Sequence, residues 1–146
     1  MEGAERDGCR GDLERAPGRR RPALILIDST GWIEYLGKGP KAELYEKHVV
    51  ENAPDQILTP TIVVLEVYRK IKKDKGEEKA LEAYAHLDGT NMVPLDVRTA
   101  VAAADLGLKS GLGTVDSIIY AIAKHYKAEL ITSDHHFQGL ERVTLI

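Results

Sequence analysis

The chain has 146 residues, a length that suits one domain with a single hydrophobic core. Hydrophobic residues make up 43% and charged residues 29%, a balance typical of a globular protein. The net charge of −3 gives no support for nucleic-acid binding through bulk charge, and no apolar run reaches the roughly 20 residues that span a membrane. The single cysteine, Cys9, excludes an internal disulfide and is compatible with a reducing cytoplasm, where we expect the protein to act.

The first 21 residues differ in composition from the rest of the chain. They are rich in glycine, arginine and acidic residues, and Leu13 is their one bulky aliphatic residue. We expect residues 1–21 to form a disordered extension. The alternative is that they result from a start codon assigned too far upstream. Residues 22–146 are expected to form the folded domain.

From residue 22 onward, short apolar segments alternate with segments of helical spacing. The expected strands are 23–27, 55–60, 91–95, 128–134 and 142–146. The expected helices are 31–37, 41–53, 61–73, 76–87, 97–111 and 114–127. Thr59 is expected to cap the third helix, with Pro60 as its first residue. This alternation predicts the α/β class: a three-layer α/β/α sandwich around a mainly parallel sheet of four to five strands.

Two acidic residues directly follow apolar strands. Asp28 ends the segment "ALILID", and Asp134 ends "ELITSD". Considered alone, Asp28 is more typical of a helix N-cap and Asp134 of a turn or cap than of a functional site. Because parallel strands bring their carboxyl ends to one edge of the sheet, however, the two carboxylates are expected to lie near each other.

Two further acids occur in apolar helices. Glu66 is surrounded by valine and leucine in "TIVVLEVY", where a buried carboxylate needs a cation, a metal or a hydrogen-bond partner. The alternative is an exposed Glu66 paired with Lys70 one turn later. Asp116 lies in the first turn of "TVDSIIYAIA", where the helix dipole favours an acid, with Thr114 expected as the cap.

Together, these four acids predict a metal site. Converging carboxylates repel one another, and oxygen ligands suit Mg²⁺ or Mn²⁺. Two such ions can clamp the attacking and leaving oxygens of a phosphodiester, so the reaction inferred is hydrolysis by a metal-activated water. Neighbouring hydroxyls are expected to support the carboxylates by hydrogen bonds; these are Ser29, Thr30, Thr132 and Ser133.

The order of the motifs "LILIDST…W", "TIVVLEV", "LGTVDSIIYAIA" and "LITSDHHF" resembles the PIN domain family, and within it the VapC-type ribonuclease toxins. The resemblance covers nearly all of 22–146. It implies catalytic and metal-binding roles for Asp28, Glu66, Asp116 and Asp134 in a Mg²⁺- or Mn²⁺-dependent RNA endonuclease. It also implies a homodimer and inhibition by a small, VapB-like antitoxin protein.

Other functions stay open at this point. The domain could process RNA outside a toxin system, or serve as a catalytically inactive PIN-like scaffold. A phosphorylated aspartate after the first strand is a further alternative, but haloacid-dehalogenase-like phosphatases need a second Asp where this chain has Thr30. His135 and His136 could contact RNA phosphate or a metal, but solvated loop residues are the favoured interpretation. The basic run "YRKIKKDK" is compatible with either RNA phosphate contacts or a solvated helix end.

Overall fold

The computed structural model describes residues 23–146, and the predicted extension 1–21 lies outside this part. Five parallel strands form one sheet in the order β3-β2-β1-β4-β5. The strands are β1 (Ile25–Ile27), β2 (Ile57–Pro60), β3 (Asn91–Val93), β4 (Glu129–Thr132) and β5 (Val143–Leu145). The predicted parallel sheet is therefore confirmed, with five strands.

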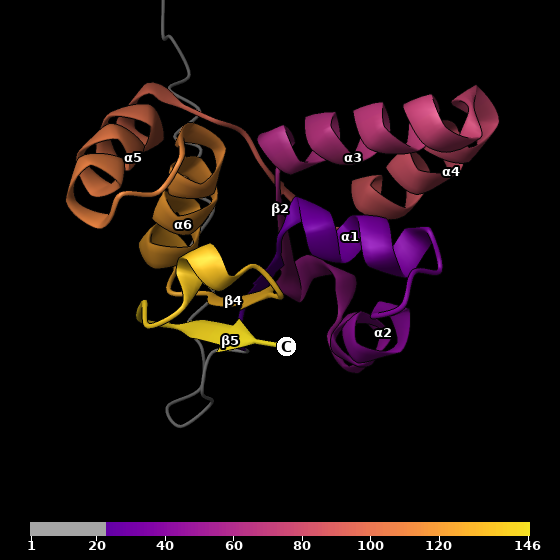
Figure 1. Cartoon of the computed structure of the whole chain (residues 1–146), viewed down its shortest axis with the longest axis horizontal. Coiled ribbons are helices and arrows are strands. Elements are labelled where there is room, and N and C mark those ends of the chain that lie inside the picture. The colour runs from indigo at the N-terminus through magenta and orange to yellow at the C-terminus, as the bar shows by residue number, and fades with distance from the viewer. Residues whose placement is uncertain (1–22) are drawn as a thin grey trace, which may run out of the picture.

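Six α-helices cover the sheet in two layers. They are α1 (Ser29–Leu36), α2 (Ala42–Glu51), α3 (Thr61–Lys75), α4 (Glu77–Asp88), α5 (Val97–Ser110) and α6 (Thr114–Tyr126). Two short 3₁₀ turns, η1 (Pro54–Gln56) and η2 (His135–Phe137), complete the described part. Helices α1 to α4 lie on one side of the sheet and α5 and α6 on the other, which confirms the three-layer α/β/α arrangement (Figure 1).

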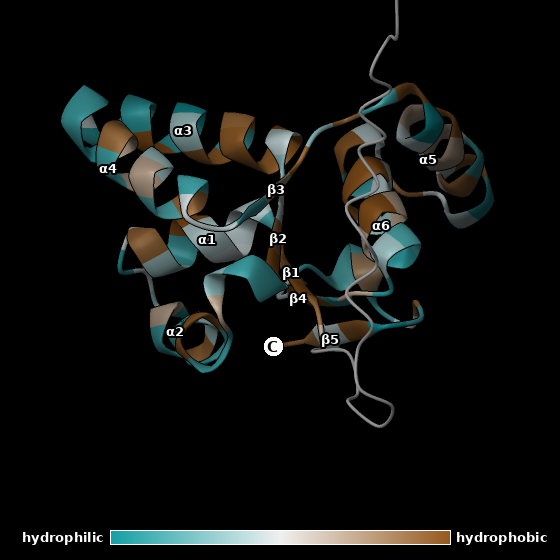
Figure 2. Ribbon diagram, turned by 180° about the vertical axis from the view of Figure 1, so that it is seen from behind, coloured by the Kyte–Doolittle hydropathy of each residue, from teal (hydrophilic) through white to brown (hydrophobic). Residues whose placement is uncertain are grey.

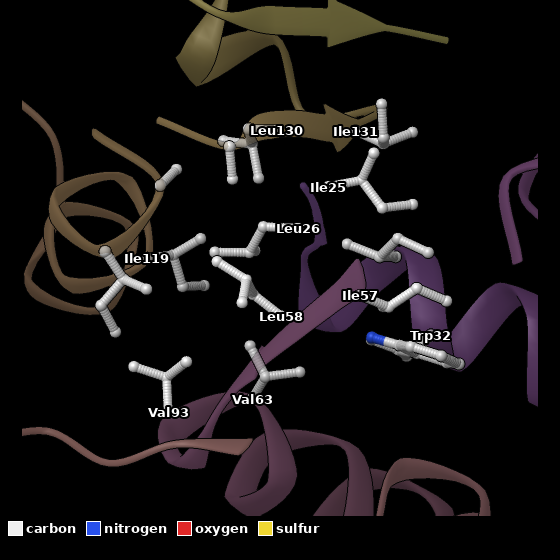
Figure 3. Close-up of a cluster of buried hydrophobic side chains, with 14 of the residues drawn as sticks. Ile25, Leu26, Trp32, Ile57, Leu58, Val63, Val93, Ile119, Leu130 and Ile131 are labelled. Atoms are coloured by element: carbon white, nitrogen blue, oxygen red, sulfur yellow. The ribbon is translucent and has the colours of Figure 1, made fainter. Parts of the chain in front are cut away.

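The core is made by side chains that alternate between the two faces of short, buried strands. Leu26, Leu58 and Leu130 lie in register on neighbouring strands and point towards Ile119 of α6 (Figure 3). Ile25, Ile57 and Ile131, which are next to them in sequence, lie on the side of Trp32 of α1 (Figure 3). Because both faces are covered by helices, the strands read as continuous apolar runs rather than as alternating ones.

Helix α6 is buried along most of its length, as its sequence predicts. Every residue from 117 to 123 is buried, and hydrophobic residues dominate the helix where it packs against the sheet (Figure 2). Gly107 of α5 allows α6 to approach, since a methyl group there would lie 2.6 Å from Ser117 Oγ. This close packing fixes the first turn of α6, which carries Asp116.

Two helix starts differ from the sequence prediction. Thr59 does not cap α3: Pro60 is extended as the last residue of β2, and the Thr59 hydroxyl shares a 2.6 Å hydrogen bond with that of Thr90. Thr114 is the first residue of α6 and Gly113 is its cap. In both places the backbone conformation set by the neighbouring strand or loop overrides the capping preference of threonine.

No helix within residues 23–146 is long and apolar enough to cross a membrane.

Candidate active site

The four acids selected from the sequence come from four separate elements. Asp28 lies between β1 and α1, Glu66 lies on α3 after β2, Asp116 is in the first turn of α6, and Asp134 follows β4. The strands are parallel, so the segments that follow β1, β2 and β4 all start from the same edge of the sheet. The topology therefore directs three of these acids to one edge, and α6 directs the fourth towards it.

Asp28 is both a helix cap and a member of the acidic cluster. It is 3% exposed, and its Oδ1 accepts a 3.0 Å hydrogen bond from the backbone N–H of Gly31 in the first turn of α1. Its Oδ2 accepts a 2.6 Å bond from the Thr132 hydroxyl. Burial raises the pKa of Asp28 to about 6; the charges of Asp134 and Asp116 add to the rise, and the two hydrogen bonds oppose it. Asp28 can therefore cap α1 and belong to the acidic cluster at the same time, because each of its carboxylate oxygens has its own partner.

Thr132 links two of the acids. Its hydroxyl donates to Asp28 and accepts a 3.0 Å hydrogen bond from the backbone N–H of Asp134. Thr132 is fully buried at the end of β4. The hydroxyl thus fixes the relative position of β1 and the turn after β4, as a supporting residue would.

The remaining three predicted supporting residues have other contacts. Ser133 Oγ accepts a 3.0 Å hydrogen bond from the hydroxyl of Tyr45, a buried residue of α2. Ser29 and Thr30 lie in the first turn of α1 beside Glu66. Among residues 23–146, neither of these two side chains hydrogen-bonds to a carboxylate.

Asp116, Asp134 and His136 offer one ligand atom each, all within 4.8 Å of one another. Within this group, Asp134 Oδ1 lies 3.0 Å from His136 Nδ1. The pKa of Asp116 is raised, chiefly by burial and then by the negative charges of Asp134 and Glu66, while His136 lowers it. The cluster therefore carries mutual repulsion that a cation would relieve.

Glu66 is half-buried, and its Oε1 is buried without a hydrogen-bond partner in the described part of the chain. Pairing with Lys70 is excluded in this structure, because the Lys70 ammonium lies 3.0 Å from Asp74 instead. A buried carboxylate oxygen without a partner is costly. The unsatisfied oxygen of Glu66, together with the oxygen-rich set around Asp116, fits a divalent cation such as Mg²⁺ or Mn²⁺.

Sequence reasoning did not select His136 or Tyr45. His136 was interpreted as a solvated loop residue, and its side chain is largely exposed, but the turn η2 directs it back onto Asp134. The spacing Asp-x-His within a tight turn was the available signal. For Tyr45, helical spacing predicts a buried residue, but no pattern indicates that its hydroxyl reaches Ser133 across 88 residues of sequence.

The parallel sheet and the carboxylates gathered at its carboxyl-terminal edge define the class of protein. The PIN domain family model matches residues 25–143, and the chain belongs to this family. The search of curated proteins found no match.

Among solved structures, the chain is similar to VapC toxins and their complexes. It is 26% identical to a chain of a toxin–antitoxin complex from Klebsiella pneumoniae, with a TM-score of 0.68, covering 82% of this chain and 95% of that one. It matches VapC20 from Mycobacterium tuberculosis, a sarcin–ricin loop cleaving toxin, with 13% identity, a TM-score of 0.70, and 82% and 96% of the two chains covered. A chain of the DNA-bound VapBC2 complex from Rickettsia felis matches with 18% identity, a TM-score of 0.67, and 84% and 97% covered. At 13% and 18% identity, the similarity to VapC20 and to the VapBC2 chain is a similarity of fold.

Proposed function

We propose that this PIN domain is a Mg²⁺- or Mn²⁺-dependent RNA endonuclease that hydrolyses phosphodiester bonds. The observation that carries the proposal is the convergence of Asp116, Asp134 and His136 next to the buried carboxylate of Asp28. VapC20, whose fold this chain shares, is a sarcin–ricin loop cleaving toxin.

In this proposal, Asp28, Glu66, Asp116 and Asp134 hold the metal, directly or through water. The bound ion would supply an activated water and would neutralise charge that develops on the phosphate. Asp28 keeps its carboxylate oriented through Gly31 N–H and the Thr132 hydroxyl. Glu66 Oε1, which lacks a hydrogen-bond partner within residues 23–146, is available as a ligand or as an acceptor for a water.

The test is an RNA cleavage assay with Mn²⁺, with EDTA, and with the variants Asp28→Asn and Asp116→Asn. We expect wild-type cleavage that EDTA abolishes, and a loss of at least a hundredfold in each variant. Asp96→Asn is the matched control, because Asp96 also caps a helix but is exposed, and it should cleave like the wild type. Wild-type rates for Asp28→Asn would refute the assignment. Absence of both saturable Mn²⁺ binding and cleavage would favour an inactive scaffold.

We further propose that the nuclease is the toxin of a VapBC-type pair, acting as a homodimer and inhibited by a small antitoxin. Support comes from the toxin–antitoxin complex to which the chain is 26% identical. An adjacent reading frame that encodes a small protein able to block the Mn²⁺-dependent cleavage would support this pairing. Cleavage with no such inhibitor would favour an RNA-processing nuclease. Light scattering of the purified chain tests the dimer.

A further inference from the structure

A groove of about 440 Å³ opens beside Glu66 and is lined mainly by residues of α1 and α3. These two helices lie next to each other (Figure 1). Its apolar lining comes from three helices and includes Ile33 of α1, Leu65 of α3 and Val115 of α6. Leu65 is 55% exposed, although it is a large aliphatic residue adjoining the acidic site. The groove therefore combines one carboxylate of the site, Glu66, with an apolar surface.

Three cations line the same groove beyond Glu66. Arg69, Lys70 and Lys73 follow Glu66 by three, four and seven residues, so they continue the same face of α3. Lys70 is paired with Asp74, but within residues 23–146 neither Arg69 nor Lys73 forms an ion pair. A helix rises about 1.5 Å per residue, so the cations reach about 10 Å along the helix from Glu66.

A chain of single-stranded nucleic acid fits this arrangement. Its phosphates need cations at the rim of a groove, and its bases need an apolar surface on which to lie. The charge also changes sign along α3: the acidic end suits metal ions and the basic end suits phosphates. Because the whole chain has a net charge of −3, this basic face is a local feature.

We propose that this groove, defined by Ile33, Leu65, Arg69, Lys73 and Val115, binds the single-stranded RNA segment that flanks the cleaved phosphodiester. Arg69 and Lys73 contact its phosphates, and Leu65 contacts a base. This inference rests on the proposed nuclease function, because it assigns the substrate path that leads into that site.

The first test measures the binding of a labelled single-stranded RNA oligonucleotide in EDTA, as a function of salt concentration. The double variant Arg69→Ala/Lys73→Ala should weaken binding roughly tenfold at low salt and should reduce the slope of log K against log salt by about 1.4. The matched control is Lys72→Ala, which removes one charge from the same helix outside the groove. The Lys72 ammonium pairs with Glu77 and lies over the ring of Tyr68. It should leave the slope unchanged.

The second test separates the apolar contact from the charges. Leu65→Ala should weaken RNA binding about fivefold with an unchanged salt slope, because an aliphatic contact is not screened by ions. The folded state should be unaffected, since the side chain is largely exposed.

Cleavage with Mn²⁺ distinguishes this proposal from the proposed function. If wild type cleaves RNA but the double variant keeps wild-type affinity and salt slope, the groove assignment is overturned and the nuclease assignment stands. If the double variant instead loses binding of a polyglutamate peptide while RNA binding is unchanged, the groove serves an acidic protein partner and the proposal is also overturned. If wild type binds RNA through Arg69 and Lys73 but does not cleave it with Mn²⁺, the nuclease assignment fails while the binding assignment stands.

Discussion

The Asp28→Asn variant should be more stable than the wild type when no metal is present. A pKa raised from 3.8 to about 6 means that ionised Asp28 destabilises the folded chain by about 3 kcal/mol. Asparagine removes the charge, and its side-chain oxygen can still accept from the Gly31 N–H. Its NH₂ group, however, replaces the oxygen that accepts from the Thr132 hydroxyl, so this hydroxyl loses its acceptor. That loss costs about 1 kcal/mol, which leaves a net gain of about 2 kcal/mol. For a domain of this size, we expect Tm to rise by about 8 °C.

The pH dependence fixes the sign of this effect. At low pH, Asp28 is protonated in both the folded and unfolded states and contributes no penalty. As pH rises from about 4 to about 6, the unfolded chain ionises first, so the wild type loses stability relative to the variant. Above about pH 6 the difference should be complete.

Thermal unfolding in EDTA between pH 4 and pH 7.5 measures the difference. Asp96→Asn is the control, because Asp96 caps α5 while fully exposed, and its pKa is lowered chiefly by the backbone N–H of Thr99. This variant should show no gain in Tm at neutral pH. Saturating Mn²⁺ should raise the Tm of the wild type and narrow its difference from Asp28→Asn. An Asp28→Asn protein no more stable than the wild type at pH 7.5 in EDTA would refute the reasoning.

Three further substitutions test the supports of the site. Thr132→Val should destabilise the fold by about 1–3 kcal/mol in urea unfolding and should also impair cleavage. The control Thr59→Val loses the hydrogen bond to Thr90 and should lower stability without impairing cleavage. Equal cleavage by both variants would contradict the role of Thr132 in linking Asp28 to Asp134. Tyr45→Phe should cost about 1 kcal/mol, measured in the same way, by removing the hydroxyl that Ser133 accepts from, and an unchanged midpoint would count against this bond. Gly31→Ala should cost about 1–3 kcal/mol, because its methyl would overlap the Tyr45 ring and the Ile27 side chain, whereas Gly89→Ala meets its nearest atom at 3.5 Å and should change little; equal effects would contradict the packing argument.

The layer arrangement could be predicted from the sequence because its signals are local and repeated. Short apolar segments such as the one that forms β4 alternate with helices of clear period, and a mainly parallel sheet is predicted from that alternation. Helix α4 is exposed on a side where its sequence is apolar. The helical spacing of Ala80, Leu81, Tyr84 and Leu87 predicts one apolar side, but Leu81 and Tyr84 are each more than 40% exposed, whereas Ala83 is buried. Periodicity gives the helix, but tertiary packing decides which of two neighbouring apolar faces is covered.

The carboxylate cluster could be anticipated because strand ends in a parallel sheet share an edge. The sequence predicts Thr132 as a hydrogen-bonding support of the carboxylates, but it does not predict which carboxylate Thr132 contacts, because such contacts join residues far apart in sequence. Thr132 and Asp28 are 104 residues apart, and Tyr45 and Ser133 are 88 apart. No local pattern encodes such a pairing; it depends on which strands become neighbours and in which register.

Asp28 illustrates why choosing between a structural and a functional role can mislead. Its cap hydrogen bond holds one oxygen towards Gly31, and the carboxylate can stay buried only because a second partner, Thr132, takes the other oxygen. Yet the raised pKa means that these two bonds do not fully offset the burial of the charge. A carboxylate needed only as a cap would be better placed at the surface, as Asp96 is, where capping lowers its pKa. The contrast between these two caps in one chain supports the proposal that Asp28 binds a cation in addition to capping α1.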